Sequence, residues 1–190
     1  MAFALVVVGA SLGGLHALEI LLAGLPAHFP LPVAIGQHRR QDADDALCAA
    51  LQRRSALPVG EAEDKEAIVP GRVYVAPAGY HLLVEEGRFA LSTEAPVAYA
   101  RPSIDVLFES AADVYETGVI GVILTGASKD GSQGAARIKV RGGFVVVQDP
   151  RTAEASVMPE AAIAATDVDR ILPLAAIGPC VAALSRCGGR

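Results

Sequence analysis

A serine in a glycine-rich segment near the start of the chain is the first indication of chemistry. The segment Gly9-Ala10-Ser11-Leu12-Gly13 has the spacing G-x-S-x-G, between an apolar run and a helical pattern. On such a strand-to-helix turn a serine points its hydroxyl outward, and the following helix N-terminus offers unpaired N–H groups to an oxyanion. The pattern is typical of a serine nucleophile. The alternative is a plain turn with Ser11 as a helix cap; the dinucleotide fingerprint G-x-G-x-x-G is not matched.

A serine hydroxyl needs a base within about 2.6–3.2 Å to react near neutral pH, and the chain has four histidines. His38 directly follows an apolar run, one predicted strand after Ser11, so both residues project from the same rim of a parallel sheet. We expect His16, within the first helix, and His28, in a proline-rich connection, at the surface. His81 opens a predicted hairpin, away from the strand ends. His38 is therefore the candidate base, with a structural histidine as the alternative.

An imidazole base in turn needs an acceptor that fixes its tautomer and stabilises the imidazolium. Asp130 follows the strongest strand signal of the chain and directly precedes Gly131 and a helical pattern. In isolation it would be interpreted as the cap of that helix. However, Ser11, His38 and Asp130 each follow a different predicted strand, so they can converge. Their order along the chain differs from the familiar hydrolase orders, but a triad is defined by geometry. The sequence thus predicts a Ser11–His38–Asp130 triad.

Alternating strands and helices are expected to position these residues. Short apolar runs predict strands, and Glu86-Gly87 predicts the tight turn of a hairpin. The predicted strands are 4–8, 33–37, 59–61, 73–76, 118–125 and 144–148, with the hairpin at 80–85 and 88–92. The predicted helices are 13–25, 44–54, 103–115 with Ser103 as its cap, 132–140, 158–165 and 175–185.

This alternation predicts an α/β fold. We expect a single doubly wound, mostly parallel sheet with helices on both faces, to which the hairpin adds an antiparallel edge. The length of 190 residues suits one domain, and the sequence has no internal repeat, low-complexity tract or linker.

Composition and charge exclude other classes of protein. With 52% hydrophobic and 19% charged residues, disorder is not the main state. Acidic residues number 21 against 16 basic ones, for a net charge of −5, so we expect no nucleic-acid partner. The apolar segment 1–15 is shorter than the ~20 residues of a membrane-spanning helix. It also lacks the positive start of a secretory signal, because the first basic residue is Arg39. We expect a protein that is not inserted in a membrane.

The three cysteines indicate a reducing compartment. Cys48, Cys180 and Cys187 are odd in number and have no C-x-x-C spacing, so they predict neither a disulfide framework nor a zinc site. Cytoplasmic location follows as the expectation. We expect Cys48 and Cys180 to be buried as small apolar residues and Cys187 to lie in a tail.

Further segments give the sequence a resemblance to a known family. From about Val6 to Leu184 it resembles the catalytic domain of chemotaxis receptor methylesterases of the CheB type. The segments that carry the resemblance are Val8-Gly9-Ala10-Ser11, Gly13-Gly14, Gln37-His38, Pro70-Gly71-Arg72-Val73-Tyr74-Val75-Ala76-Pro77, His81-Leu82-Leu83-Val84, Arg101-Pro102-Ser103-Ile104-Asp105-Val106-Leu107-Phe108, Leu124-Thr125-Gly126, Asp130-Gly131, Gly142-Gly143, Val147-Gln148-Asp149-Pro150 and Met158-Pro159.

The resemblance implies a serine hydrolase that removes methyl groups from glutamate γ-methyl esters of chemotaxis receptors, often together with deamidation of receptor glutamines. Ser11 falls on the family nucleophile, His38 on its base and Asp130 on its acid. The oxyanion and substrate loops fall on Leu12, Gly13, Ala127 and Met158. No metal or organic cofactor is implied, and the implied partners are methyl-accepting chemotaxis receptors or a similar methylated signalling protein.

The resemblance also frames the domain organisation and the alternatives. Chemotaxis members usually carry an N-terminal receiver domain, so we expect residues 1–190 to be a stand-alone catalytic domain, with a separate receiver protein as a candidate partner. The loops at Leu12, Arg39-Arg40 and Ala127-Ser128 depart from the family pattern. A non-catalytic signalling module on the same fold therefore stays open, and a nucleotide-binding domain is the weaker alternative.

Overall fold

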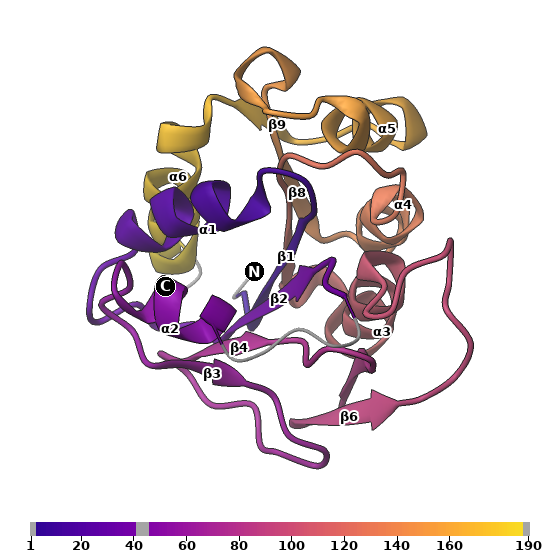
Figure 1. The fold of residues 1–190 in the computed structure, drawn as a ribbon. Helices are drawn as coiled ribbons and strands as arrows, with labels where there is room; N and C mark the ends of the chain where they lie inside the picture. Colours follow the sequence, from indigo (N-terminus) through magenta and orange to yellow (C-terminus); the bar gives the residue numbers. More distant parts are fainter. Residues whose placement is uncertain (1–2, 41–45, 188–190) are drawn as a thin grey trace.

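The computed structural model describes residues 3–40 and 46–187, and its centre is a parallel sheet (Figure 1). The strands of this sheet are β1 (Leu5–Ala10), β2 (Val33–Gln37), β3 (Val59–Glu61), β4 (Val73–Val75), β7 (Val119–Ile123), β8 (Phe144–Gln148) and β9 (Arg170–Leu172). Their order is β3-β4-β2-β1-β7-β8-β9, and every pair of neighbours is parallel. The predicted α/β fold is confirmed.

Helices cover both faces of this sheet (Figure 1). The helices are α1 (Gly14–Ala23), α2 (Ala46–Gln52), α3 (Ile104–Tyr115), α4 (Ser132–Val140), α5 (Val157–Ala165) and α6 (Leu174–Cys187). Short 3-10 turns, η1 (Glu116–Gly118) and η2 (Pro150–Thr152), precede β7 and follow β8. Helices α1, α2 and α6 pack on one face, and α3, α4 and α5 pack on the other.

Strand β1 shows why the sheet has two apolar faces. Val6 and Val8 belong to the core beneath α1 and α6, while Leu5 and Val7 belong to the core beneath α3. Successive strand residues point to opposite faces, so a strand that is covered on both sides is apolar throughout. This explains why the continuous valine run of β1 reads as a buried strand in the sequence.

The direction in which strands are added to the sheet reverses at β1, and this reversal indicates where a functional site can form. From β1 the chain adds β2, then the edge strand β3, and then β4 between β3 and β2; after the hairpin it returns to β7, on the other side of β1. In open α/β sheets, loops diverge at such a point and leave a crevice at the carboxyl ends of the strands. The segments that follow β1, β2 and β7 meet at this edge.

The hairpin is where the predicted architecture was wrong. Strands β5 (His81–Glu85) and β6 (Arg88–Ser92) form their own two-stranded antiparallel sheet and do not extend the edge of the main sheet. The hairpin instead packs its apolar face against α3, where Leu82, Val84 and Phe89 join the core around Phe108. The backbone N–H of Val84 donates to Ser110 Oγ of α3 at 3.0 Å.

Smaller corrections concern the ends of the elements. The short strand β9 was not predicted, because its three residues are largely exposed and carry no apolar run. Helix α6 continues through Cys187, so this residue does not lie in a tail, and Cys48 and Cys180 are half-buried rather than buried. Residues 44–45 of the predicted second helix lie outside the described residues.

Candidate active site

The structure brings the three predicted side chains together at the carboxyl edge of the sheet. Ser11 follows β1, His38 follows β2, and Asp130 lies in the loop after β7. The sheet register already aligns the first two, because Ala10 is paired with Gln37. Ser11 Oγ lies 3.1 Å from His38 Nδ1, and His38 Nε2 lies 2.7 Å from Asp130 Oδ2.

Backbone hydrogen bonds continue the sheet into these loops. The N–H of His38 donates to Ala10 O at 3.1 Å, and the N–H of Ser11 donates to Thr125 O at 3.0 Å. Thr125 Oγ1 in turn donates to Leu12 O at 2.9 Å. The turn that carries the serine is thus tied to both neighbouring loops, and the position of Ser11 follows from the sheet itself.

The protonation state of Asp130 determines which ring nitrogen of His38 carries the hydrogen. Burial alone would raise the pKa of Asp130, but hydrogen bonds from His38, the backbone of Asp105 and Ile104, and Ser103 together hold its pKa below its ordinary value. An ionised carboxylate only accepts, so His38 Nε2 carries the hydrogen that it donates to Asp130. The lone pair on His38 Nδ1 therefore faces the Ser11 hydroxyl, as a general base requires.

The N-terminus of α3 forms the cradle of Asp130. Asp130 Oδ2 accepts from Ile104 N–H at 2.7 Å, and Oδ1 accepts from Asp105 N–H at 2.9 Å and from Ser103 Oγ at 2.8 Å. The positive end of a helix stabilises a carboxylate, which the two N–H groups also hold in place. The Asp130 side chain is fully buried, whereas that of His38 is 18% exposed.

Two glycines allow α3 to come this close to the strand ends. A side-chain carbon on Gly9 would collide with Ile104, and one on Gly131 would lie 2.7 Å from Ile104 Cγ2. Gly131 also has a positive φ of 96°, which side chains disfavour. These glycines place the first turn of α3 directly over the carboxyl edge, where Asp130 lies.

The capping alternatives for Ser11 and Asp130 are wrong. Gly13 is the N-cap of α1 and Gly131 is the N-cap of α4, and neither helix has a side-chain cap hydrogen bond. Ser103 does cap α3 as predicted, since its Oγ accepts from Val106 N–H. Asp130 therefore binds the start of α3, a helix 26 residues earlier in sequence, and not the helix that follows it.

Asp105 mirrors this arrangement in the opposite direction. Its backbone N–H donates to Asp130, while its own Oδ1 accepts from Gly134 N–H of α4 at 2.7 Å. Asp130, which precedes α4, thus binds the N-terminus of α3, and Asp105 of α3 binds the N-terminus of α4. Burial raises the pKa of Asp105 to about 6, against the opposing hydrogen bond from Gly134 and with the negative charges of Asp130 and Glu109 in support.

No role of its own was predicted for Gln37, yet Gln37 connects the serine and the histidine. Its Nε2 donates to Ser11 O at 3.0 Å and to His38 O at 3.1 Å. Its Oε1 is buried and has no hydrogen-bond partner among the described residues. The available signal was a glutamine at the end of an otherwise apolar strand, because buried polar side chains need a reason.

His81 was predicted to lie away from the site, and this was wrong. It is buried, its Nδ1 accepts from Ser103 N–H at 3.2 Å, and its Nε2 donates to Ala95 O at 3.1 Å. His81, Ser103 and Asp130 do not form a second triad. Ser103 is buried and its hydroxyl donates directly to the carboxylate, while both nitrogens of His81 bond to backbone groups. His81 thus holds Ser103, which in turn donates a hydrogen bond to Asp130. The other two histidines, His16 and His28, are exposed as predicted.

The predicted oxyanion loops lie beside Ser11. In the described part of the chain, no acceptor bonds the backbone N–H of Leu12 or of Ala127. Ala127 follows Gly126, where a side-chain carbon would lie 2.9 Å from Ser11 Cβ and 2.6 Å from the terminal methyl of Met158. Buried Met158 fixes this loop, since its N–H donates to Gly126 O at 2.9 Å.

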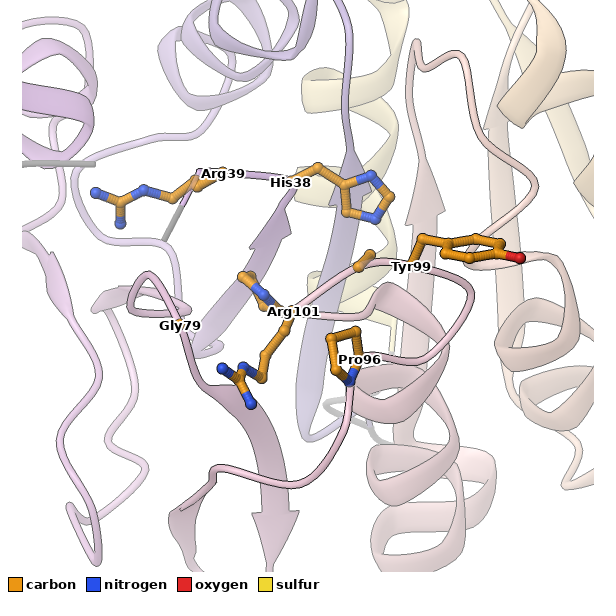
Figure 2. A pocket seen from close by; sticks show the side chains of 8 residues that line it. His38, Arg39, Gly79, Pro96, Tyr99 and Arg101 are labelled. Atoms are coloured by element: carbon orange, nitrogen blue, oxygen red, sulfur yellow. The ribbon is translucent and has the colours of Figure 1, made fainter. Parts of the chain in front are cut away.

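Open pockets flank the pair of Ser11 and His38. One, of about 270 Å³, lies on the histidine side, and Figure 2 shows His38, Arg39, Gly79, Pro96, Tyr99 and Arg101 around it. The other, of about 420 Å³, lies on the serine side. It is lined by Ser11, Leu12, Gly13, Gln37 and the carboxyl-bearing Glu19 and Glu154, among others. A polypeptide side chain can therefore reach Ser11 from solvent.

Two other features are absent from the part of the chain that the structure describes. Within residues 3–40 and 46–187, no group of three or more His, Cys, Asp or Glu side chains is placed to hold a metal ion. Across the same ranges, no helix has the length and apolar character to cross a membrane.

Comparisons with known proteins point to one family. Residues 6–181 match the family described as CheB methylesterase. The chain is 48% identical over 175 residues to a putative protein-glutamate methylesterase/protein-glutamine glutaminase from Leptospira interrogans, covering 92% of this chain and 91% of that protein. It is 44% identical over 185 residues to a protein of the same kind, numbered 1, from Carboxydothermus hydrogenoformans, where it covers 94% of this chain but 54% of the relative.

A solved structure gives the same fold. The CheB methylesterase catalytic domain of Thermotoga maritima superposes with a TM-score of 0.92 at 35% sequence identity. The match covers 97% of this chain and all of that one. The resemblance seen in the sequence is thus supported over the whole described fold.

Proposed function

Because the chain belongs to the CheB methylesterase family, we propose that it hydrolyses γ-methyl esters of glutamate side chains in a methylated signalling protein, with chemotaxis receptors as the substrate. The observation that carries the proposal is the continuous relay from Ser11 Oγ through His38 to buried Asp130. The histidine side chain is partly exposed and the carboxylate is not, so the relay runs from solvent into the core.

The reaction follows the usual course of acyl transfer to a serine. Ser11 Oγ attacks the ester carbonyl while its proton passes to His38 Nδ1, and Asp130 stabilises the imidazolium that forms. The tetrahedral oxyanion accepts hydrogen bonds from the N–H groups of Leu12 and Ala127. His38 then returns the proton to the departing methoxide, which leaves as methanol.

The second half releases the enzyme. Water loses a proton to His38 and attacks the acyl-enzyme, and the collapse of the second tetrahedral intermediate regenerates the Ser11 hydroxyl and a free glutamate carboxylate. The same steps on a glutamine side chain expel ammonia in place of methanol. We therefore include deamidation of substrate glutamines, the second activity in the names of the relatives, in the proposal.

The cellular setting belongs to the same proposal. We place the reaction in the cytoplasm, the compartment that the cysteine content predicts. A reducing compartment also suits Cys180, which is a free cysteine in the structure.

Loss of the serine hydroxyl tests the function directly. Purified protein is incubated with a peptide or receptor fragment that carries a glutamate γ-methyl ester, and released methanol is measured. We expect Ser11→Ala to lose activity by at least about 10³-fold, because removal of a triad member leaves only oxyanion and binding contributions. Ser185→Ala is the matched control. Its hydroxyl donates to Ala182 O in α6, and its turnover should equal that of the wild type.

A serine-directed phosphonate separates catalysis from a purely binding role. Stoichiometric labelling of the wild type and of Ser185→Ala, without labelling of Ser11→Ala, supports the hydrolase. If the folded wild-type protein takes up no label and releases no methanol, the non-catalytic signalling module is the better interpretation. Wild-type turnover in Ser11→Ala would refute the proposed mechanism.

A further inference from the structure

The pocket beside His38 carries a charge that ester hydrolysis does not use. Among the residues that the structure describes, its lining includes Arg39 and Arg101 together with His38 and has no Asp or Glu. This contrasts with the whole chain, whose net charge is −5, and with the pocket on the serine side, whose lining includes Glu19 and Glu154. An anionic group is therefore attracted to one side of Ser11 and repelled from the other.

Among the described residues that line this pocket, Arg101 is the cation whose charge no carboxylate balances. Arg39 forms an ion pair with Glu61, and its side chain is almost fully buried. In Figure 2, Arg39 extends away from the other labelled side chains. Arg101 uses only Nη1, which donates to the carbonyl oxygens of Thr93 at 2.9 Å and Glu94 at 3.0 Å. Carbonyl groups hold a guanidinium in place without neutralising it.

The remaining donors of Arg101 are available to a ligand. Within the described residues, no carboxylate lies within ion-pair distance of Arg101, and its Nε and Nη2 groups make no hydrogen bond. Two parallel N–H groups of a guanidinium match the two oxygens of a carboxylate. The chemistry that Arg101 can recognise is therefore a carboxylate.

A strained turn forms the wall of the same pocket. Val97 and Ala100 exchange backbone hydrogen bonds at 3.1 and 2.9 Å, and the two residues between them, Ala98 and Tyr99, have φ values of 48° and 66°. Left-handed backbone is unfavourable for residues with a Cβ, and such strain is concentrated at functional sites. The turn leaves the Tyr99 side chain completely exposed, and Tyr99 lines the pocket together with Arg101.

We propose that this pocket binds a second carboxylate of the substrate, so that the protein prefers glutamyl esters with another acidic side chain close by. Arg101 is the residue that determines this preference. The inference rests on the proposed function, because it seats the ester at Ser11 while the second carboxylate lies on the His38 side. It adds the substrate class: an acidic peptide segment rather than any accessible methyl ester.

A matched set of peptides tests the preference. Each peptide carries one glutamate γ-methyl ester and either a glutamate or a methionine at one of the four positions on either side. Methionine has nearly the same length as glutamate and cannot be deamidated. For the wild type we expect at least one position where the glutamate peptide has a kcat/KM about 5–20-fold higher, mostly through KM, as one charge-assisted hydrogen-bond pair allows. High salt should reduce this ratio.

Two variants assign the preference to Arg101. In Arg101→Gln the glutamate-to-methionine ratio should fall to about one at that position, even if loss of the loop contacts slows both peptides. Arg54→Gln removes the same charge from an exposed arginine that follows α2 and lies outside the pocket, and it should keep the wild-type ratio. A merely structural role of Arg101 would lower both rates together and leave the ratio unchanged.

The outcomes separate the two proposals. A wild type that hydrolyses both peptides of every pair equally, or an Arg101→Gln variant that keeps the wild-type ratio, overturns the carboxylate pocket. A wild type that hydrolyses no peptide overturns the proposed function instead. In that case the pocket is still tested by fluorescence anisotropy with the labelled ester-free peptides. The glutamate form must bind more tightly than the methionine form, and Arg101→Gln must abolish that difference.

Discussion

Asp130 and Ser11 lie within one relay, yet the protein holds them in opposite ways. Asp130 is fully buried and accepts hydrogen bonds from His38, Ser103, Ile104 and Asp105. The Ser11 hydroxyl bonds to His38 and lies between two open pockets, next to backbone N–H groups that no described residue uses. The acid is part of the fold's own hydrogen bonding, whereas the serine side has donors left for a substrate.

This difference has a physical reason. In the proposed reaction, the carboxylate that stabilises the imidazolium must stay charged and fixed throughout, which a buried set of hydrogen-bond donors favours. The nucleophile must exchange partners at every step, so neighbours that remain unpaired until the substrate arrives suit it better. We therefore expect substitutions on the acid side to change both folding and catalysis, and substitutions on the serine side to change catalysis alone.

The largest expected effect is that of Asp130→Ala. Four donors lose their acceptor, and the buried ones cannot turn to water, so the free energy of unfolding should fall by about 2–4 kcal/mol. The turnover number should fall by roughly 10³–10⁴-fold. Thermal unfolding and methanol release measure the two effects.

Ser11→Ala is the counterpart that could break the comparison. It should lose activity to a similar degree while its stability stays within about 0.5 kcal/mol of the wild type, because Ser11 Oγ is not part of the core. Equal destabilisation by the two variants would show that the acid side and the serine side are not held differently.

Two buried glutamines, the last residues of strands β2 and β8, give the next largest effect. Gln37→Leu loses two hydrogen bonds between the serine and histidine loops. It also removes a buried oxygen that has no partner among the described residues, so stability should change by less than about 1 kcal/mol. Catalysis should fall by about 10–100-fold in kcat, because small displacements of reacting groups are costly. Paired melting and kinetic measurements test this.

Gln148→Leu is the matched substitution. Gln148 Oε1 accepts from buried Thr125 N–H at 2.9 Å, and Nε2 donates to Thr152 O at 3.0 Å, so its amide has partners on both sides. This variant should lose more stability than Gln37→Leu. If Gln37→Leu is instead the less stable of the two, its orphaned oxygen has a partner that the described residues do not include.

The dependence of stability on pH distinguishes Asp105 from Asp130. Its pKa in the folded protein, about 6, lies above its ordinary value of 3.8, so the folded state binds more protons between these pH values. Stability from this group is fully present below about pH 4 and is lost as pH rises to about 6. The lowered pKa of Asp130 has the opposite effect: its stability is present above about pH 4 and is lost as pH falls.

Asp105→Asn isolates the first of these two effects. The asparagine oxygen can still accept from Gly134, but the negative charge next to Asp130 is removed. The difference in unfolding free energy between the variant and the wild type should shift in favour of the variant, on the order of 1 kcal/mol after allowance for solvent screening, as pH rises from 4.5 to 7. Thermal melts at these two pH values measure the gain. A difference that does not change with pH would mean that Asp105 stays ionised in the folded protein across this range.

The sequence was sufficient to find the relay because parallel strands end at one edge. The residues after three apolar runs are Ser11, His38 and Asp130, and β1, β2 and β7 are neighbours in the sheet. Local pattern thus located the residues, and a general rule of sheet topology brought them together. The separation of the hairpin from the main sheet could not be read in this way, since its alternating pattern fits an edge strand equally well.

The support of Asp130 was beyond sequence patterns for a different reason. Asp130 and Ile104 are 26 residues apart, and their bond depends on how closely α3 approaches Gly9 and Gly131. His81 was misjudged because its role runs through Ser103 and not through a strand end. Such contacts depend on helix packing across the sheet, which capping preferences within a single helix do not describe.

Leu12→Ala is expected to have the smallest effect, and it tests whether the serine side works through its backbone. The Leu12 side chain is 54% exposed, so its truncation should not lower stability measurably. If the contribution of Leu12 is its N–H group, kcat should change by less than about threefold, because alanine keeps that donor. Kinetics with one methyl-ester peptide are sufficient. A rise in KM of more than about tenfold with kcat unchanged would instead assign the Leu12 side chain to substrate binding. The serine side would then also select its ligand through side chains, as the pocket beside His38 does.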